Sequence, residues 1–126
     1  MCYTHQMETM QIYNVYDSDC PTRAALALIA DKWTALIIGL LEDGPKRFSA
    51  LRRGIGGISQ KMLTQTLREL ERNGIVSRTV FPEVPPHVEY ELTTLGHSLS
   101  APIGAVRDWA EEHIREVSLA QQVYDG

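Results

Sequence analysis

The chain has 126 residues, of which 44% are hydrophobic and 22% are charged. This length suits one domain with a buried core, and the composition is that of a globular protein rather than a disordered one. No apolar run approaches the roughly 18 to 20 residues of a membrane span, and the N-terminus has no signal-peptide pattern, so we expect a cytoplasmic protein that does not enter membranes. The two cysteines, Cys2 and Cys20, are too few for a disulfide framework.

Basic residues are concentrated in one part of the chain. Positions 46–80 hold eight basic and two acidic residues, a net charge of +6, whereas the rest of the chain holds four basic and fourteen acidic residues, a net charge of −10. The whole chain therefore carries −4. A basic segment inside an acidic protein is typical of a surface that binds a polyanion, and a solvated charged face is the ordinary alternative.

The N-terminal part is predicted to contain an arm and a first helix. Residues 1–18 are polar, mixed and without a hydrophobic period, so we expect an arm whose order depends on a partner. Pro21 suits the first turn of a helix. This helix is expected to run to about Ala30 and to bury Leu26 and Ile29.

The next helix has the clearest hydrophobic period of the chain. Apolar residues recur at i, i+3, i+4, i+7 and i+8, the spacing of one buried helix face. They are Trp33, Leu36, Ile37, Leu40 and Leu41. Gly44 and Pro45 end this helix. We expect residues 46–48 to be extended and residues 48–53 to form a short helix that stops at the glycine-rich segment 54–57.

A longer helix is predicted between Ser59, a good N-cap, and the helix-stop pair Asn73–Gly74. Its predicted buried stripe is Leu63, Thr66, Leu67 and Leu70. The opposite face presents amides, hydroxyls and bases, with no carboxylate before Glu69: Gln60, Lys61, Thr64, Gln65 and Arg68. Ordinary solvated helix faces alternate acids and bases for pairing, so this face favours a binding function.

Two β-rich runs follow, residues 75–81 and 88–92, on either side of the proline-rich tip 82–87. They predict a hairpin that projects from the domain. A last helix is predicted with Pro102 near its start or at a kink, from an apolar series made of Leu99, Ile103, Val106, Ala110, Ile114 and Val117. Trp109 and Tyr124 are candidate aromatic anchors of a dimer interface.

The order of these elements predicts the fold class. Helix, helix, short strand, helix, helix, two-stranded wing and helix is the order of a winged helix-turn-helix, which is a mainly α fold with a small β-wing. We expect a single domain over residues 19–117, preceded by the arm at 1–18 and followed by a C-terminal tail at 118–126. Dimerisation is expected through the terminal helices.

The helix at 59–73 has the chemistry for reading double-stranded DNA, because a helix fits the major groove and can present donors and acceptors to base edges. Gln60 and Gln65 could bond adenine, while Lys61 and Arg68 could reach guanine or phosphate. The other predicted DNA-binding residues are Ser59, Thr64, Arg47, Arg52, Arg53, Arg78 and His87. The alternative is a winged-helix module that binds an acidic protein partner, but such a face should show exposed aromatics or leucines.

Several motifs resemble the HxlR-type family of bacterial winged-helix regulators. The resemblance covers about residues 18–117, with the motifs in the family's order. They are Cys20-Pro21, Asp31-Lys32-Trp33-Thr34, Arg47-Phe48-Ser49-Ala50-Leu51, the run ISQKMLTQTLREL from Ile58 to Leu70, and the wing run PPHVEYELT from Pro85 to Thr93 with Gly96 after it.

The resemblance implies a homodimeric transcription factor, often a repressor, that binds a roughly palindromic operator. Some members of the family sense oxidants or electrophiles through a cysteine placed as Cys20 is here. The chain departs from the family pattern at Ala30, where glycine is common, and at His87, where arginine is common. The second departure weakens the expectation of a contact between the wing and phosphate.

Cys20 is the candidate redox-sensing residue, and a small buried thiol with a packing role is the alternative. It directly precedes a predicted helix N-terminus, where unpaired N–H groups stabilise a thiolate, and Arg23 could add positive charge. Asp17 and Asp19 would instead favour the neutral thiol. Oxidation could lead to a disulfide with Cys20 or Cys2 of the other subunit, or an electrophile could add directly.

No motif indicates catalysis, so we expect no enzyme activity and no cofactor. Ser, His and Asp are present, but no nucleophile elbow places them together. The four histidines have no short metal-ligand spacing, and we predict no metal site. Asp108 with His113, or His97 across a dimer, is the alternative that would contribute to one.

Overall fold

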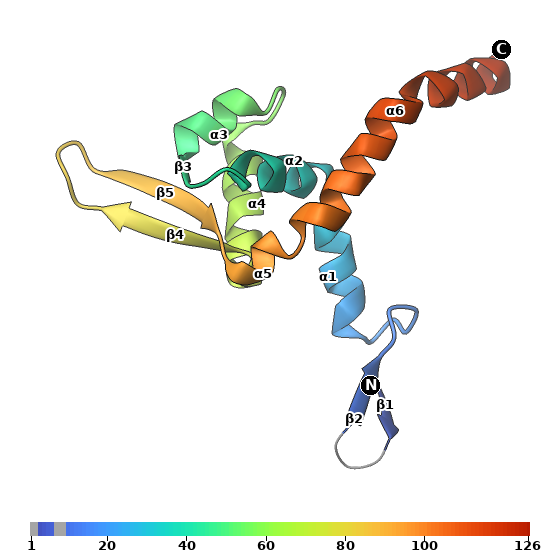
Figure 1. The fold of residues 1–126 in the computed structure, drawn as a ribbon, viewed down its shortest axis with the longest axis horizontal. Coiled ribbons are helices and arrows are strands. Elements are labelled where there is room, and N and C mark those ends of the chain that lie inside the picture. Colours follow the sequence, from blue (N-terminus) through green and yellow to red (C-terminus); the bar gives the residue numbers. More distant parts are fainter. Residues whose placement is uncertain (1–2, 7–9) are drawn as a thin grey trace.

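The computed structural model describes residues 3–6 and 10–126. Figure 1 shows a body of helices from which a two-stranded hairpin and the last helix project. In chain order, the elements are β1 (Tyr3–Gln6), β2 (Met10–Tyr13), α1 (Pro21–Ile29), α2 (Lys32–Leu41), β3 (Lys46–Arg47), α3 (Phe48–Gly54), α4 (Gln60–Arg72), β4 (Val76–Phe81), β5 (His87–Leu92), α5 (Thr94–His97) and α6 (Ser100–Asp125). The fold is the predicted one, mainly α with a small β-wing.

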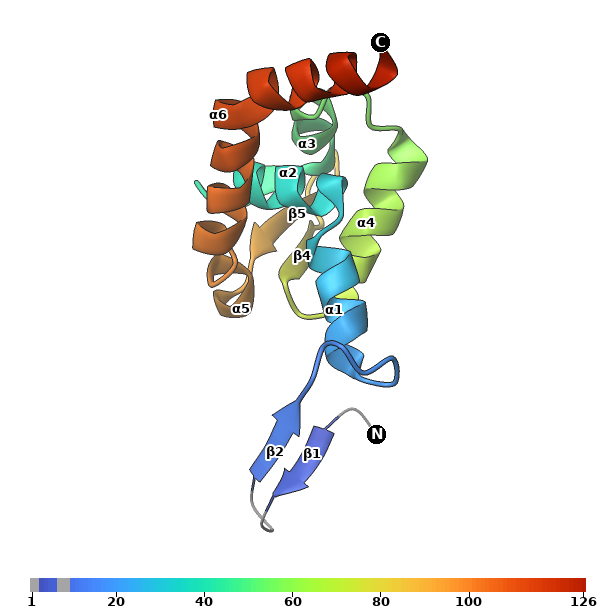
Figure 2. The same cartoon turned by 90° about the vertical axis from the view of Figure 1, so that its right-hand side faces the viewer.

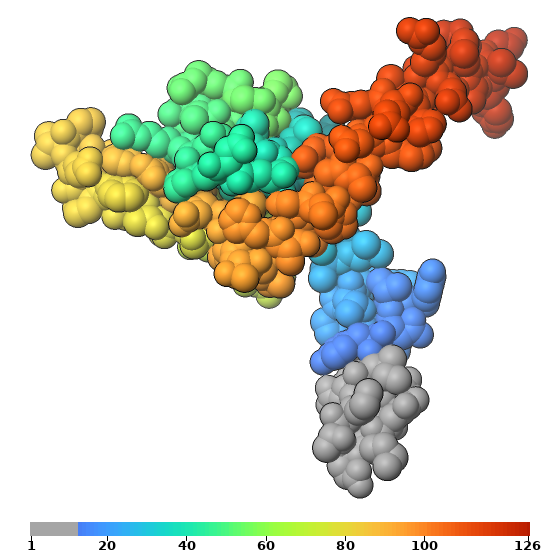
Figure 3. Space-filling view, in the orientation of Figure 1, coloured from blue at the N-terminus to red at the C-terminus, as the bar shows by residue number. Residues whose placement is uncertain are grey.

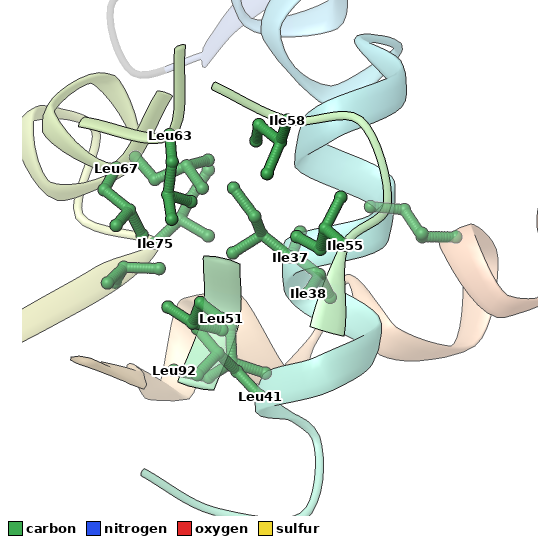
Figure 4. Close-up of a cluster of buried hydrophobic side chains, with 13 residues drawn as sticks. Ile37, Ile38, Leu41, Leu51, Ile55, Ile58, Leu63, Leu67, Ile75 and Leu92 are labelled. Carbon is green, nitrogen blue, oxygen red and sulfur yellow. The ribbon is translucent and has the colours of Figure 1, made fainter. Parts of the chain in front are cut away.

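The core lies between α2 and α4. Ile37, Ile38 and Leu41 of α2 pack in one cluster with Leu63 and Leu67 of α4, and each of these side chains is at most 1% exposed. Figure 4 shows this cluster closed by side chains from α3, from the loop after α3 and from the sheet. The buried stripe predicted for α4 is confirmed. The core therefore fixes α4 from behind and leaves its opposite face to solvent.

The predicted apolar face of α2 is only partly right. Trp33 and Leu40 are partly buried against the core, but Leu36 is 40% exposed. Ile38 lies outside the predicted stripe and is fully buried. The reason is that α2 contacts α4, α6 and β5, so it buries more than one face.

The wing is the outer part of a three-stranded antiparallel sheet with strand order β3-β5-β4. The short extended piece predicted at residues 46–48 forms the edge strand β3, in which Lys46 lies opposite Tyr90. On the other side of β5, Arg78 of β4 also lies opposite Tyr90. Figure 1 shows β4 and β5 extending away from the helical body.

Helix α6 is longer than the sequence predicted. Pro102 lies in its first turn, where the missing N–H costs no helical hydrogen bond. The helix then runs to Asp125, so the segment 118–126, expected as a tail, is helical except for Gly126. Figures 2 and 3 show α6 leaving the body and changing direction along its length. Of its 26 residues, only Ile103 is buried.

The N-terminal arm contains regular structure that the sequence analysis did not predict. Strands β1 and β2 pair in antiparallel fashion, with Tyr3 opposite Tyr13. Strands of four residues are too short to show a convincing alternating pattern, which explains the difference. Cys2 lies outside the described residues.

Helix α1 begins at Pro21 as predicted, but it buries none of its residues. Leu26 is 52% exposed and Ile29 only partly buried, so the predicted burial of these two residues is wrong for the single chain. Along the described part of the chain, no single helix is long and apolar enough to cross a membrane. The pair α1 and α2 meets that test only jointly, across a 68° bend, and by length and composition alone.

Candidate nucleic-acid interface

Both ends of α4 are closed by local hydrogen bonds. The Ser59 hydroxyl accepts a hydrogen bond from the Met62 N–H at 3.0 Å, as an N-cap does. At the other end, Gly74 adopts a φ of +75°, which a residue with a side chain rarely takes. The predicted helix and its cap are confirmed. The caps and the buried stripe together hold α4 in one orientation.

Five predicted residues come together on the exposed face of α4. They line an open hollow of about 520 Å³, which we call the α4 hollow, and they are Gln60, Lys61, Thr64, Gln65 and Arg68. All are exposed except Thr64, which is partly buried. The lining carries amide, hydroxyl, ammonium and guanidinium groups and no carboxylate. This donor-rich surface matches the edges of bases and the phosphates beside them.

Helix α3 adds positive charge next to α4 in the chain. Arg52 and Arg53 lie in its last turn and are exposed, and Arg47 is exposed at its N-cap. Exposed arginines in the helix that precedes α4 suit contacts with DNA phosphates. Such contacts position a protein on DNA but carry no sequence information.

The wing places its two predicted residues differently. Arg78 is exposed, and its Nε lies 3.8 Å from the carboxylate of Glu71 on α4. His87, one of the predicted DNA-binding residues, is largely covered, and its side chain is 13% exposed. Its ring stacks on Phe81 with centroids 4.7 Å apart, and its Nε2 lies 3.1 Å from Glu89. Packing within the hairpin explains why His87 is covered.

Sequence reasoning missed two residues beside this surface, Glu71 and Tyr90. Tyr90 lies between Arg78 and the edge strand β3, and burial raises the pKa of its phenol. The sequence carries no signal for the hairpin register that places Tyr90 opposite Arg78.

Cys20 is buried at the N-cap of α1, with 3% of its surface exposed. Its Sγ lies 2.8 Å from the hydroxyl of Thr22. The guanidinium of Arg23 donates to the carbonyls of Val15 and Tyr16 at 3.3 and 3.2 Å. The loop before α1 is thus fastened to the first turn of the helix that carries the thiol.

Within residues 3–6 and 10–126, no group of three or more His, Cys, Asp or Glu side chains is placed to hold a metal ion. His113, one of the residues weighed for such a site, stacks on Trp109 with ring centroids 4.7 Å apart.

A capped helix with a donor-rich outer face, a basic helix before it and a β-wing after it define a winged helix-turn-helix DNA-binding protein. The HxlR-like helix-turn-helix family model matches residues 28–118. The chain belongs to this family.

Individual relatives agree with this classification. The helix-turn-helix-type transcriptional regulator YtfH of Escherichia coli is 46% identical over 104 residues, which cover 82% of each chain. The solved structure of ytfH from Salmonella typhimurium superposes with a TM-score of 0.80 at 46% identity, covering 86% of this chain and 96% of that one. The oxidised form of the redox regulator HypR gives a TM-score of 0.68 at 43% identity, covering 74% and 96%. The chain is accordingly a transcriptional regulator and not an enzyme.

Proposed function

We propose that this protein is a homodimeric repressor that binds a roughly palindromic operator and responds to oxidants or electrophiles through Cys20. The α4 hollow carries the DNA-binding part of this proposal. It gathers five side chains able to bond bases or phosphates on one face of a helix whose other face is locked in the core. The exposed cations of α3 and Arg78 of the wing would then contact the backbone on either side. His87 is not one of these contacts, because packing covers its side chain.

The test of DNA reading is a selection of duplexes from a random library by the purified protein, followed by mobility-shift titration. We expect one sequence to be enriched, with two related half-sites. The enriched duplex should bind at least about a thousandfold more tightly than an unrelated one at equal salt concentration. Failure to retain any duplex would favour the alternative of a protein-binding module. Met62 of α4 is 38% exposed but does not line the α4 hollow, so this face offers little apolar surface to such a partner.

The dimer part of the proposal rests on apolar surface that the single chain leaves exposed. Leu26 of α1 and a series along α6 are more than half exposed: Val106, Trp109, Ile114, Leu119, Val123 and Tyr124. Apolar side chains at this density along neighbouring terminal helices are typical of an interface between subunits. One reading helix contacts few base pairs, so a two-fold dimer supplies a second one at a spacing of about 34 to 36 Å.

Sedimentation equilibrium tests this assembly directly. We expect a dimer at micromolar concentration, with and without the selected duplex. A monomer that still binds a palindrome tightly would exclude the proposed interface.

The redox part concerns a thiol that the structure buries. Cys20 sits at the start of α1, where the helix dipole favours a thiolate. Because only 3% of Cys20 is exposed, we propose that an oxidant reacts when the start of α1 and the loop fastened to it open. Two thiols of a dimer would then join in a disulfide, losing two electrons and two protons to the oxidant. The resulting cross-link lies beside the proposed interface and would change the distance between the two reading helices.

The experiment is a mobility shift with and without diamide, on wild type and on Cys20→Ser and Cys2→Ser variants. We expect diamide to weaken binding by wild type and to leave Cys20→Ser unaffected. Equal loss in wild type and Cys20→Ser, or no loss in either, would leave Cys20 as a packing residue.

The sign of regulation is tested separately with a reporter gene placed behind the selected duplex. A repressor lowers reporter output when the protein is expressed. An increase would show that the protein is an activator.

A further inference from the structure

A second hollow lies between α4 and the wing, and we call it the α4–wing cleft. Its volume is about 220 Å³, and it is lined by Thr64, Arg68, Glu71, Arg78 and Tyr90. The three residues from α4 are spaced by about one helical turn, so they share one side of the helix. Arg78 and Tyr90 are opposite one another on β4 and β5 and share one face of the wing. The cleft is therefore formed jointly by the helix and the hairpin.

The charges around Tyr90 favour an anion in this cleft. Burial raises the pKa of the phenol; Arg78 and Arg68 oppose that change, while Glu71 adds to it. The phenol therefore stays protonated at neutral pH and presents an O–H donor. With two guanidinium groups against one carboxylate, the cleft has a net positive charge and a surplus of hydrogen-bond donors.

Glu71 pairs with Arg78 through only one of the guanidinium nitrogens. The pair joins Arg78 Nε and a Glu71 carboxylate oxygen at 3.8 Å, and the two side chains are 45% and 42% exposed. Such a half-exposed pair is weak, and the other guanidinium donors of Arg78 are not used by it. Two oxygens of one phosphate can each accept a hydrogen bond from the Arg78 guanidinium. This bidentate contact can compete with the single long contact to Glu71.

We propose that the α4–wing cleft binds one phosphate of the DNA backbone, with Arg78 and Tyr90 donating hydrogen bonds to it and Glu71 holding Arg78 until DNA displaces the carboxylate. This inference rests on the proposed DNA binding. Thr64 and Arg68 line both the cleft and the α4 hollow, so a duplex seated on the hollow brings its backbone to the cleft. Tyr90 is then a phosphate contact, and Glu71 limits affinity because it leaves a negative charge beside the phosphate.

The first experiment compares three variants on a duplex selected by the wild type and on an unrelated duplex. Tyr90→Phe removes only the hydroxyl and should weaken binding to both duplexes about tenfold, since a hydrogen bond to a charged group is lost without loss of base reading. Glu71→Gln should strengthen binding to both about threefold or more. Glu69→Gln is the matched control, because it removes the same charge from the same helix, where Glu69 pairs with the exposed Arg72 at 3.7 Å. Thermal unfolding of each variant shows that the fold is kept.

The second experiment locates the phosphate by replacing single phosphates of the selected duplex with neutral methylphosphonates. At one position in each half-site, the replacement should weaken DNA binding by wild type about tenfold. It should weaken binding by Tyr90→Phe much less, because that variant already lacks the hydrogen bond that the replacement removes. Any one of three results would exclude the cleft as a phosphate site. They are wild-type binding by Tyr90→Phe, a gain in affinity for Glu71→Gln no larger than that for Glu69→Gln, and additive effects of Tyr90→Phe and the replacement at every phosphate. If wild type binds no duplex at all, the proposed function fails together with this inference; if it binds but these differences are missing, only the inference fails.

Discussion

Helices α4 and α6 both carry apolar residues at helical spacing, but they use them differently. α4 has 13 residues and buries four of them within its own chain. α6 has 26 residues and buries one. The apolar residues of α4 meet α2, whereas most of those on α6 face solvent in the single chain.

The difference separates two tasks that the chain must perform. Around α4, the chain completes its own core, so the reading face is held rigidly by contacts that need no partner. Along α6, the apolar surface is completed only when a second chain covers it. We therefore expect changes on α4's buried side to act on folding, and changes on α6 to act on assembly.

The largest effect is expected from Leu67→Ala. Leu67 is 1% exposed in the centre of the core, and its truncation leaves a cavity that the packed neighbours cannot fill. The free energy of unfolding should fall by about 2–5 kcal/mol. Denaturant unfolding at a fixed protein concentration measures it. Leu119→Ala makes the same chemical change on α6, where Leu119 is 55% exposed, and should act on dimer affinity instead. Equal loss of folding stability in the two variants would contradict the division of tasks.

Trp109→Ala should have the next largest effect, on assembly. Trp109 is 57% exposed although it is a large aromatic side chain, and tryptophans of this kind dominate the energy of interfaces. We expect the dimer to weaken by about 2–4 kcal/mol, measured by sedimentation. Val80→Ala is the control, because Val80 is 54% exposed on the wing, outside the proposed interface. Dimerisation that resists Trp109→Ala would exclude this part of α6 from the interface.

The exposed side of α4 should respond in affinity and not in folding. Gln65→Ala should cost about 1–3 kcal/mol of binding and relax the preference at one base position, as expected for loss of a bidentate contact with adenine. Arg52→Ala should instead weaken all duplexes alike and reduce the salt dependence of binding by about one unit of slope. Titrations at several salt concentrations distinguish the two. If Gln65→Ala and Arg68→Ala both bind the selected duplex like wild type, the assigned face is wrong.

The parts of the fold that the sequence predicted well are those with local signals. Ser59, the stop at Gly74 and the stripe that includes Leu63 are all read within one helix, and that helix is buried by its own chain. The same reasoning gave the wing strands and the residues of the α4 hollow, because exposure on one face follows from burial of the other.

What the sequence could not give depends on contacts between elements. Tyr90 and Glu71 join the surface only through the register of the hairpin and its approach to α4. His87 is covered because the ring of Phe81 stacks on it, which no spacing rule indicates. We predicted too early an end for α6 because the apolar residues of its last turns remain exposed and show no buried period, although no helix-stop residue precedes Gly126.

The smallest predicted effect concerns the bond that fastens α6 to α2. Arg107 donates from Nη2 to the Glu42 carboxylate at 2.8 Å and from Nη1 to the Ala35 carbonyl at 3.0 Å. Gly39 leaves room for this guanidinium, since a Cβ there would lie 3.0 Å from Nη1. Glu42 and Arg107 have side chains 33% and 28% exposed, so their ion pair is partly screened by solvent.

We expect Glu42→Gln to reduce the free energy of unfolding by about 0.5 kcal/mol, and less in 1 M salt, where the charge interaction is screened. Arg107→Ala also loses the bond to the Ala35 carbonyl and should cost about 1–1.5 kcal/mol, with most of this loss remaining at high salt. Denaturant unfolding of both variants at low and high salt tests the assignment. If the two variants lose the same stability at both salt concentrations, the Ala35 carbonyl contributes nothing, and α6 is held to α2 by packing and the ion pair alone.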